Sequence, residues 1–201
     1  MDYNGFEYID LGLSVCWATC NVGAEKPTES GLYFQWGDIR GYNELELKNL
    51  QNEIKYKFKE DNSNWHDSWN YTKYGIDRNN RLDLVDDAAN FHMGGKWRMP
   101  TWDECKELAD ACLREKEEDV CNFFLIGESS INLSFPKCNY RTASSSLKNV
   151  ANGSWWIWTN ELSNSGDIAY ALPFRVPDEV NYKCGLRRAC ALNIRGVFSK
   201  D

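Results

Sequence analysis

"GGKWRMPTWDECKEL", residues 94–108, is the most regular short stretch of this chain. Thr101 and Glu104 have the spacing of a capping box, in which the hydroxyl and the carboxylate each accept a hydrogen bond from a backbone N–H at a helix start. Apolar residues then recur on one helical face, at Trp102, Cys105, Leu108, Ala109, Cys112 and Leu113. The stretch therefore predicts a short strand over 97–99, stopped by Pro100, and a helix directly after it.

The residues before this stretch predict strands followed by one more helix. Residues 6–22 alternate and are rich in β-branched and aromatic types, which favours two strands, and residues 32–37 favour another. "DDAANFHM", residues 86–93, predicts a short helix with Asp86 or Asp87 as its N-cap.

Residues 38–81 are polar, rich in Asn and Lys, and the least regular part of the chain. Their aromatic residues include Tyr56, Phe58, Trp65, Trp69, Tyr71 and Tyr74. The pattern predicts a long irregular insertion on the surface, held in place by its rings.

Five segments after the predicted helix favour strands, separated by Gly, Asn, Ser and Pro turns. They are residues 122–127, 131–135, 154–160, 168–176 and 189–197. Strands, two helices and then a run of strands without βαβ alternation predict an α+β fold with mainly antiparallel sheets. The length of 201 residues fits a single domain, 1–201.

Charge and composition exclude some classes of partner. The net charge of −7 argues against nucleic acid, since phosphate binding needs a surplus of Lys and Arg on one face. No apolar run approaches the roughly 20 residues that span a membrane, and no basic segment leads into an apolar core after Met1. We therefore expect neither membrane insertion nor a secretory signal in this chain.

Eight cysteines fit a disulfide framework in a small secreted protein, but a chain of this length does not need one. We expect mostly free, buried thiols.

Several motifs together resemble one known family. They are "YIDLGLSVCWATCNVGA" (8–24), "LYFQWGD" (32–38), residues 86–108, "SWWIWTNEL" (154–162), "AYALPF" (169–174) and "RRACALNIRGV" (187–197). The chain resembles the major paralogous domain of Fibrobacter and Bacteroides, with Met93 at a usual tryptophan position. It departs from the family at the end, where the usual Tyr-Gly and "VRPV" appear as Cys190-Ala191 and "IRGV" (194–197).

The resemblance implies a C-type-lectin-like fold, in which two helices pack on mainly antiparallel twisted sheets and a long irregular insertion (38–81) interrupts the domain. Relatives include the variable proteins of diversity-generating retroelements, which display a hypervariable binding surface near the C-terminus. The 94–108 block is then the buried hinge between the two helices, and a binding surface is expected on the C-terminal strands, 155–198.

The segment 160–188 mixes Asn, Asp, Tyr and Arg with short turns, as binding surfaces do. The residues that we predict to bind a ligand are Trp155, Asn160, Asn164, Asp167, Arg175, Asp178, Tyr182 and Arg187. Ordinary solvated hairpins are the alternative interpretation of the same residues.

Catalytic and metal sites have little support. His66 and His92 are the only histidines, and we interpret the second as a helix-end imidazole and adjacent Asp86 and Asp87 as capping residues. "WTNE" (158–161) is a partial match to the calcium-binding strand of C-type lectins.

Cys184 and Cys190 lack the arginine-serine-glycine-phenylalanine context of the related formylglycine-generating enzymes. We therefore expect no catalytic residues, no metal and no cofactor.

The expected function is a non-enzymatic ligand- or receptor-binding display module of a phage or gut bacterium, and the variable protein of a retroelement is one form of it. The expected partner is a protein or glycan target on a cell surface, with the chain on a virion or a cell surface; a cytoplasmic location is the alternative. Two further candidate partners are a second copy of the chain and a virion structural protein. A structural virion decoration or assembly protein is the second hypothesis, and a formylglycine-generating-type enzyme is the third.

Overall fold

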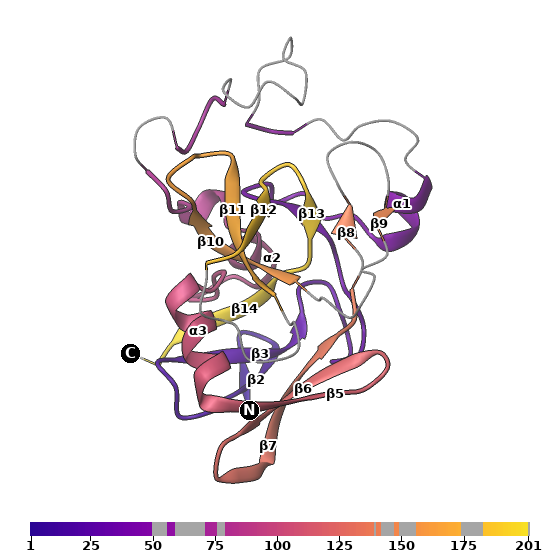
Figure 1. Cartoon of the computed structure of the whole chain (residues 1–201), viewed down its shortest axis with the longest axis vertical. Helices are drawn as coiled ribbons and strands as arrows, with labels where there is room; N and C mark the ends of the chain where they lie inside the picture. Colours follow the sequence, from indigo (N-terminus) through magenta and orange to yellow (C-terminus); the bar gives the residue numbers. More distant parts are fainter. Residues whose placement is uncertain are drawn as a thin grey trace.

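The computed structural model describes residues 1–49, 56–58, 71–75, 79–138, 140–141, 147–148, 156–173 and 183–200. Within these residues the chain is α+β, with short helices beside four small sheets (Figure 1). Every named strand pair in the described ranges is antiparallel, in agreement with the sequence prediction.

The two ends of the chain share one sheet. Its order is β1 (Asp2–Tyr3), β2 (Phe6–Ile9), β3 (Val15–Asn21) and β14 (Arg195–Ser199). A second sheet orders β4 (Phe34–Gln35), β13 (Ala191–Leu192), β8 (Tyr140–Arg141) and β9 (Leu147–Lys148). Strands from both halves of the sequence therefore meet in each of these two sheets.

The other two sheets are formed by strands that follow one another in sequence. One contains β5 (Cys112–Lys116), β6 (Val120–Leu125) and β7 (Glu128–Pro136). The other contains β10 (Trp156–Leu162), β11 (Ile168–Pro173) and β12 (Gly185–Arg187). A parallel bridge from Ile157 to Asn193 joins the latter sheet to the last part of the chain.

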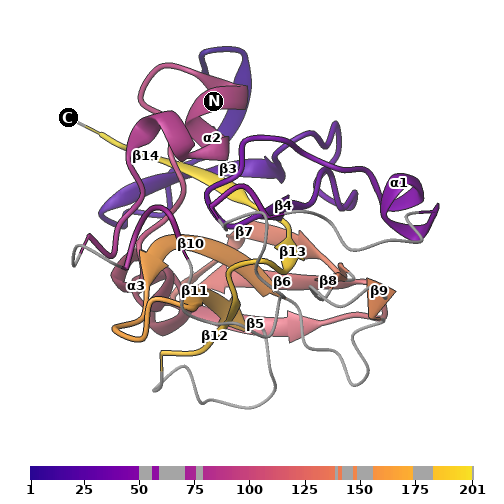
Figure 2. The ribbon, with the colours of Figure 1, turned by 90° about the horizontal axis from the view of Figure 1, so that it is seen from above.

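The helices are α1 (Glu44–Asn49), the 3₁₀ turn η1 (Leu84–Asp86), α2 (Ala88–Met93) and α3 (Trp102–Ala111). Seen from above, α3 lies at one end of the molecule, and α1 lies at the other end with β8 and β9 (Figure 2). The sequence predicts α2 and α3 but not α1.

Strand β3 is buried on both faces and separates two apolar clusters. Cys16 and Ala18 face a cluster that includes Trp36, Trp97 and Trp158. The alternate residues Val15 and Trp17 face another, formed with α3 and the β5–β6–β7 sheet. Because successive side chains of a strand point to opposite faces, one short strand contributes to both cores.

The predicted capping box at α3 is confirmed. The Thr101 hydroxyl accepts a hydrogen bond from the Glu104 N–H at 3.2 Å, and the Glu104 carboxylate accepts one from the Thr101 N–H at 2.8 Å. Arg98 also donates two hydrogen bonds to that carboxylate, at 2.8 and 2.5 Å. The block at 94–108 is thus an internally bonded unit.

Of the two residues predicted as the cap of α2, Asp86 and Asp87, the structure shows Asp87 in that position. Its carboxylate accepts hydrogen bonds from the N–H groups of Asn90, at 3.0 Å, and Met99, at 2.8 Å. Burial raises the pKa of Asp87 to about 6, against the lowering effect of these bonds.

Replacing Thr101 by alanine should lower the free energy of unfolding by about 1 kcal/mol, because one N–H at the start of α3 loses its acceptor. Urea unfolding followed by tryptophan fluorescence measures this. Thr28→Ala, in an exposed loop, is the matched control and should change little. Equal stability of the two variants would show that the box contributes nothing.

Two predictions at the ends of this block are wrong. The predicted strand 97–99 is a single bridge, in which Arg98 exchanges backbone hydrogen bonds with Val197. Leu113 does not lie on the buried helix face; it is 62% exposed in β5, because the backbone becomes extended at Cys112 and pairs with β6. The helical pattern of apolar residues in the sequence continues to Leu113, whereas pairing with β6 ends the helix at Ala111.

One more strand boundary differs from prediction. The strand expected over 32–37 is only two residues long, β4. The prediction that rings hold the 38–81 insertion in place is confirmed for Tyr56, Phe58 and Tyr74, which are at most 5% exposed and belong to the core. Trp65 and Trp69 lie outside the described residues.

Candidate ligand-binding groove

A polar groove of about 380 Å³ lies beside β10. Its lining residues are Asn79, Asn80, Arg81, Glu161, Leu162, Asn164, Tyr170 and Lys183. Three of the eight are asparagines, and we call it the amide groove. Its volume falls at the small end of the range of about 300–1,000 Å³ for small-molecule sites.

One wall of the amide groove forms because residues 80–82 pair with the edge of β10. The Leu82 N–H donates to the Asn160 carbonyl at 2.9 Å, and the Leu162 N–H donates to the Asn80 carbonyl at 2.7 Å. Arg81 lies opposite Glu161 in this antiparallel bridge. Side chains far apart in the sequence are thereby fixed on the same side of a strand pair.

A close approach of two glycines determines where this wall sits. Gly75 and Gly166 both have positive φ, 76° and 74°, and a Cβ on Gly75 would lie 2.7 Å from the Gly166 Cα. Only residues without a side chain allow the two backbones to meet this closely. The turn between β10 and β11 is therefore held against the segment that leads into the groove.

Arg188 bonds to both sides of that contact. It is fully buried, and its guanidinium donates to the carbonyls of Tyr74 and Gly166, each at 3.0 Å. Two more donors reach the Tyr56 hydroxyl at 2.8 Å and the Lys73 carbonyl at 2.6 Å. Arg188 therefore joins three stretches of chain, of which two adjoin groove-lining residues in sequence: residues 73–75 precede Asn79, and Gly166 follows Asn164.

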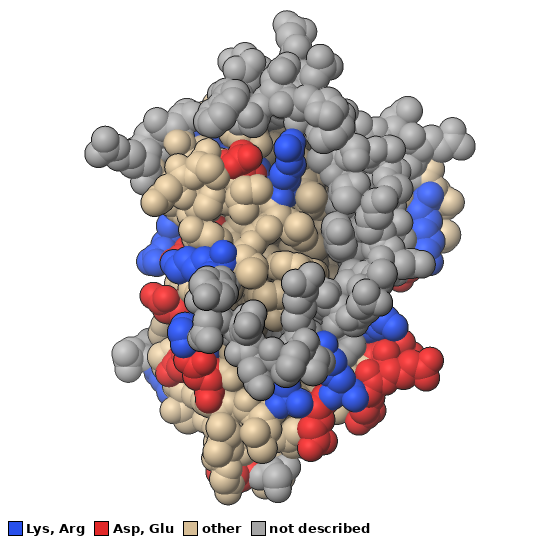
Figure 3. Space-filling view, viewed as in Figure 1, with Lys and Arg blue, Asp and Glu red and all other residues tan. Residues whose placement is uncertain are grey.

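Two cations share one carboxylate in the amide groove. Arg81 Nη2 is 2.6 Å from Glu161 Oε1, and Lys183 Nζ is 3.8 Å from Glu161 Oε2. The side chains of Arg81 and Lys183 are 62% and 47% exposed, against 13% for Glu161. Figure 3 shows basic side chains gathered at the left of the molecule, level with β10.

Amides and one aromatic ring complete the lining. Asn80 Nδ2 donates to Asn164 Oδ1 at 3.3 Å, which links the two walls. Lys183 Nζ lies 5.0 Å from the centroid of the Tyr170 ring, a cation–π distance. The amide groove thus combines hydrogen-bonding groups of both kinds with a ring and an excess of positive charge.

The structure places some of the predicted ligand-binding residues at or near the amide groove. Asn164 lines it, and Asp167 lies in the same turn, where it accepts a hydrogen bond from Ser165 at 2.5 Å. Arg187 is exposed at the end of β12. Trp155, Arg175, Asp178 and Tyr182 lie outside the described residues.

The prediction that Asn160 binds a ligand is wrong. It is only 6% exposed, and its backbone pairs with Pro100 on one side and Leu82 on the other. The sequence pattern suggested an exposed polar position, whereas the pairing of residues 80–82 covers this part of β10. Asn160 is therefore not an exposed contact residue.

Sequence reasoning missed most of the groove. Asn79, Asn80 and Arg81 fall in the predicted insertion, and Tyr170 and Lys183 were not selected. Gly75 and Gly166 mark turns in the sequence, but no local signal shows that the two turns touch.

The described histidine and Asp86, which were candidates for catalytic or capping roles, make structural contacts. His92 lies in the last turn of α2, as expected, with Nε2 2.9 Å from the Ile39 carbonyl oxygen. Asp86 does not cap a helix; it bonds Lys57 and Lys73, each at 2.6 Å. His66 lies outside the described residues.

In the parts of the chain that the structure describes, no three or more His, Cys, Asp or Glu side chains are grouped to hold a metal. All eight cysteines are free thiols, and six of them are buried.

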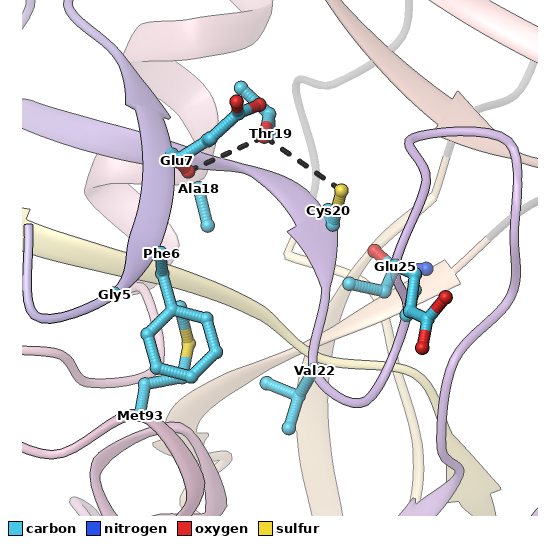
Figure 4. Close-up of a pocket in the computed structure, with 11 residues that line it drawn as sticks. Gly5, Phe6, Glu7, Ala18, Thr19, Cys20, Val22, Glu25 and Met93 are labelled. Carbon is cyan, nitrogen blue, oxygen red and sulfur yellow. Dashed lines mark hydrogen bonds between the residues drawn. The ribbon is translucent and has the colours of Figure 1, made fainter. Parts of the chain in front are cut away.

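A second hollow of about 320 Å³ opens between β2 and β3. Figure 4 shows Phe6 and Met93 on one side of it, with Cys20, Val22 and Glu25 on the other. The Thr19 hydroxyl donates to the Glu7 carbonyl at 3.4 Å across the top. Its lining contains neither Lys nor Arg, and none of the predicted binding residues lies there.

No protein-family model, curated protein or solved structure matches this chain. No helix in the described ranges has both the length and the apolar character needed to cross a membrane.

Proposed function

We propose that the protein is a non-enzymatic ligand-binding module with a C-type-lectin-like fold, and that the amide groove is its binding site. The single observation that carries the proposal is the groove itself, a polar hollow lined by an exposed arginine, an exposed lysine and a half-buried tyrosine ring. Arginine and tyrosine are enriched among residues that dominate binding energy. The resemblance to the major paralogous domain supports the fold.

The setting belongs to the proposal as well. The motif resemblance favours display on a virion or a bacterial cell surface, with a target on another cell. Loops and turns are suited to this role because a fixed scaffold positions them while their own side chains vary. Here the scaffold is the capped 94–108 block together with β3 and β14, and the variable part is the turn between β10 and β11.

A structural decoration or assembly role is the competing function. Three large apolar residues on η1 and α2 are exposed, namely Leu84 at 59%, Val85 at 71% and Phe91 at 62%. Exposed apolar residues on consecutive elements of a chain are a feature of many protein contact surfaces. This observation favours a protein contact at η1 and α2. It does not involve the amide groove, which we assign to a ligand.

A paired substitution tests the binding proposal. Asn80→Ala with Asn164→Ala removes the amide contact across the groove while leaving the ion pairs intact. We expect the variant to stay folded, because both side chains are at the surface, and to bind target cells at least about tenfold more weakly. Fluorescently labelled protein on a panel of Bacteroides cells, read by flow cytometry, measures this.

The control is Lys106→Ala with Asp110→Ala, an exposed pair on α3 far from the amide groove in sequence. It should stain cells like the parent protein. If the groove variant also stains like the parent, the binding site lies elsewhere. If the parent stains no cell in the panel, the proposed binding function is contradicted.

A further inference from the structure

We infer that the ligand of the amide groove is a saccharide that carries a carboxylate. This inference rests on the proposed function and specifies its ligand class. Among the groove-lining residues, Arg81 and Lys183 are positive and Glu161 is negative, so the groove has a net positive balance. The whole chain has a net charge of −7, which makes this local excess an exception. A positive hollow on an acidic protein attracts anions selectively.

Arg81 and Lys183 have N–H donors that their ion pairs with Glu161 do not use, and these donors can bond a ligand. Glu161 already accepts from the Trp102 N–H at 3.3 Å as well as from Arg81, so its carboxylate is well bonded. Arg81 uses one nitrogen for Glu161, and a guanidinium has five N–H donors. Lys183 Nζ is 3.8 Å from the nearest Glu161 oxygen, beyond hydrogen-bonding distance. An incoming carboxylate can therefore bond both cations without displacing Glu161.

The rest of the lining favours hydroxyl groups over apolar side chains. Leu162 is 3% exposed, which leaves the Tyr170 ring as the main accessible apolar surface. Peptide ligands gain most of their affinity by placing apolar or aromatic anchors in pockets, and the groove offers none. Asparagine amides both donate and accept in one plane, which matches neighbouring hydroxyls of a sugar. A phosphorylated or acidic peptide is therefore the less favoured anionic ligand.

The recognition mode needs no metal ion. Arginine binds carboxylates through two parallel hydrogen bonds, and lysine adds a point charge. In this arrangement the carboxylate lies between Arg81 and Lys183, while the sugar hydroxyls face Asn80 and Asn164. The affinity should fall with rising salt, because the side chains of both cations are largely exposed.

Titration calorimetry with matched sugars tests the ligand class. The probes are sialyllactose against lactose, and digalacturonic acid against its carboxyl-reduced disaccharide. We expect at least one acidic sugar to bind about tenfold or more tightly than its neutral counterpart, and added EDTA to leave this unchanged. Lys183→Gln and Arg81→Gln should each weaken the acidic sugar about tenfold, whereas the control Lys106→Gln should not.

The outcomes separate this inference from the proposed function. If acidic and neutral sugars bind alike and the Asn80/Asn164 variant weakens both, the groove is a binding site but the carboxylate inference is wrong. If a glutamate-rich peptide binds and the acidic sugars do not, the saccharide class is wrong. If both Gln variants bind acidic sugar like the parent, the cations are not the recognition groups. If none of the sugars binds although cells are stained in a groove-dependent way, the inference also fails.

Discussion

Replacing Arg188 by methionine should lower the free energy of unfolding by at least about 3 kcal/mol, one of the two largest stability changes that we expect. The guanidinium is fully buried and bonds one hydroxyl and three carbonyls from separate parts of the chain. Each buried acceptor left unpaired costs about 1–3 kcal/mol, which outweighs the apolar packing that methionine supplies. For a chain of this size the melting temperature should fall by roughly 6–12 °C.

The neighbouring residue provides a matched control. Arg187 is exposed, so Arg187→Met makes the same chemical change at the adjacent position and should stay within about 0.5 kcal/mol of the parent. Arg188→Lys should fall between the two, because an ammonium has three donors and lacks the planar geometry of the guanidinium. Equal melting temperatures for Arg188→Met and Arg187→Met would contradict the proposed role.

The same variant has a second expected effect. Arg188 bonds the carbonyls of Tyr74 and Gly166, which belong to the two stretches that meet at the contact of Gly75 with Gly166. Losing these bonds should loosen the wall formed by residues 80–82, so binding should weaken even at temperatures where the protein remains folded. Binding measured well below the melting transition tests this consequence separately from stability.

The adjacent Arg187 and Arg188 illustrate what the sequence cannot specify. Both are arginines, and both lie in a region predicted to be polar and exposed. Only the tertiary structure distinguishes them, because the partners of Arg188 come from residues 56, 73, 74 and 166. A buried arginine without a nearby acidic residue in sequence leaves no local pattern.

Features that depend on near neighbours were predictable. The caps of α2 and α3 form between residues three positions apart, so the sequence alone identifies Thr101 and Glu104 and narrows the cap of α2 to Asp86 or Asp87. Strand alternation likewise predicts Trp156, Trp158, Ala169 and Ala171 in the core, and all of them are buried except Trp156, which is half-buried. These interactions form within a few residues and need no knowledge of the overall topology.

The candidate site depended on contacts that no local rule supplies. Asn164 was predicted because it lies in a polar turn, whereas Asn80 joins it through the pairing of residues 80–82 with β10. The same pairing buries Asn160, which polarity alone would place at the surface. Segments some 80 residues apart must meet before either result becomes visible.

Arg195 provides the second large expected effect, and it acts on a different part of the fold. It is fully buried, and its guanidinium donates to Asn21 Oδ1 at 2.8 Å and to the Ala18, Thr19 and Ser134 carbonyls at 3.0, 2.7 and 3.0 Å. It therefore connects β3 to β7. Burial lowers its pKa to about 10, so Arg195 is still charged at neutral pH.

Arg195→Met should lower the free energy of unfolding by about 3 kcal/mol or more. Two effects compete, since methionine removes the cost of burying a charge but leaves four acceptors unpaired. Replacing a buried ion pair with apolar residues can be neutral when both partners are replaced, but three of these partners are backbone carbonyls that no substitution removes. The loss of hydrogen bonds should therefore dominate.

Two further measurements test the role of Arg195, and the second also distinguishes it from Arg188. The loss of stability should be the same at pH 6 and pH 8, because both lie below the folded-state pKa of about 10, where Arg195 is protonated in the folded and unfolded chains alike. Binding by the folded protein should be unchanged, since none of its partners lines the amide groove. Arg40→Met, at an exposed position, is the matched control. A variant that is as stable as this control, or that loses binding while folded, would contradict a purely structural role for Arg195.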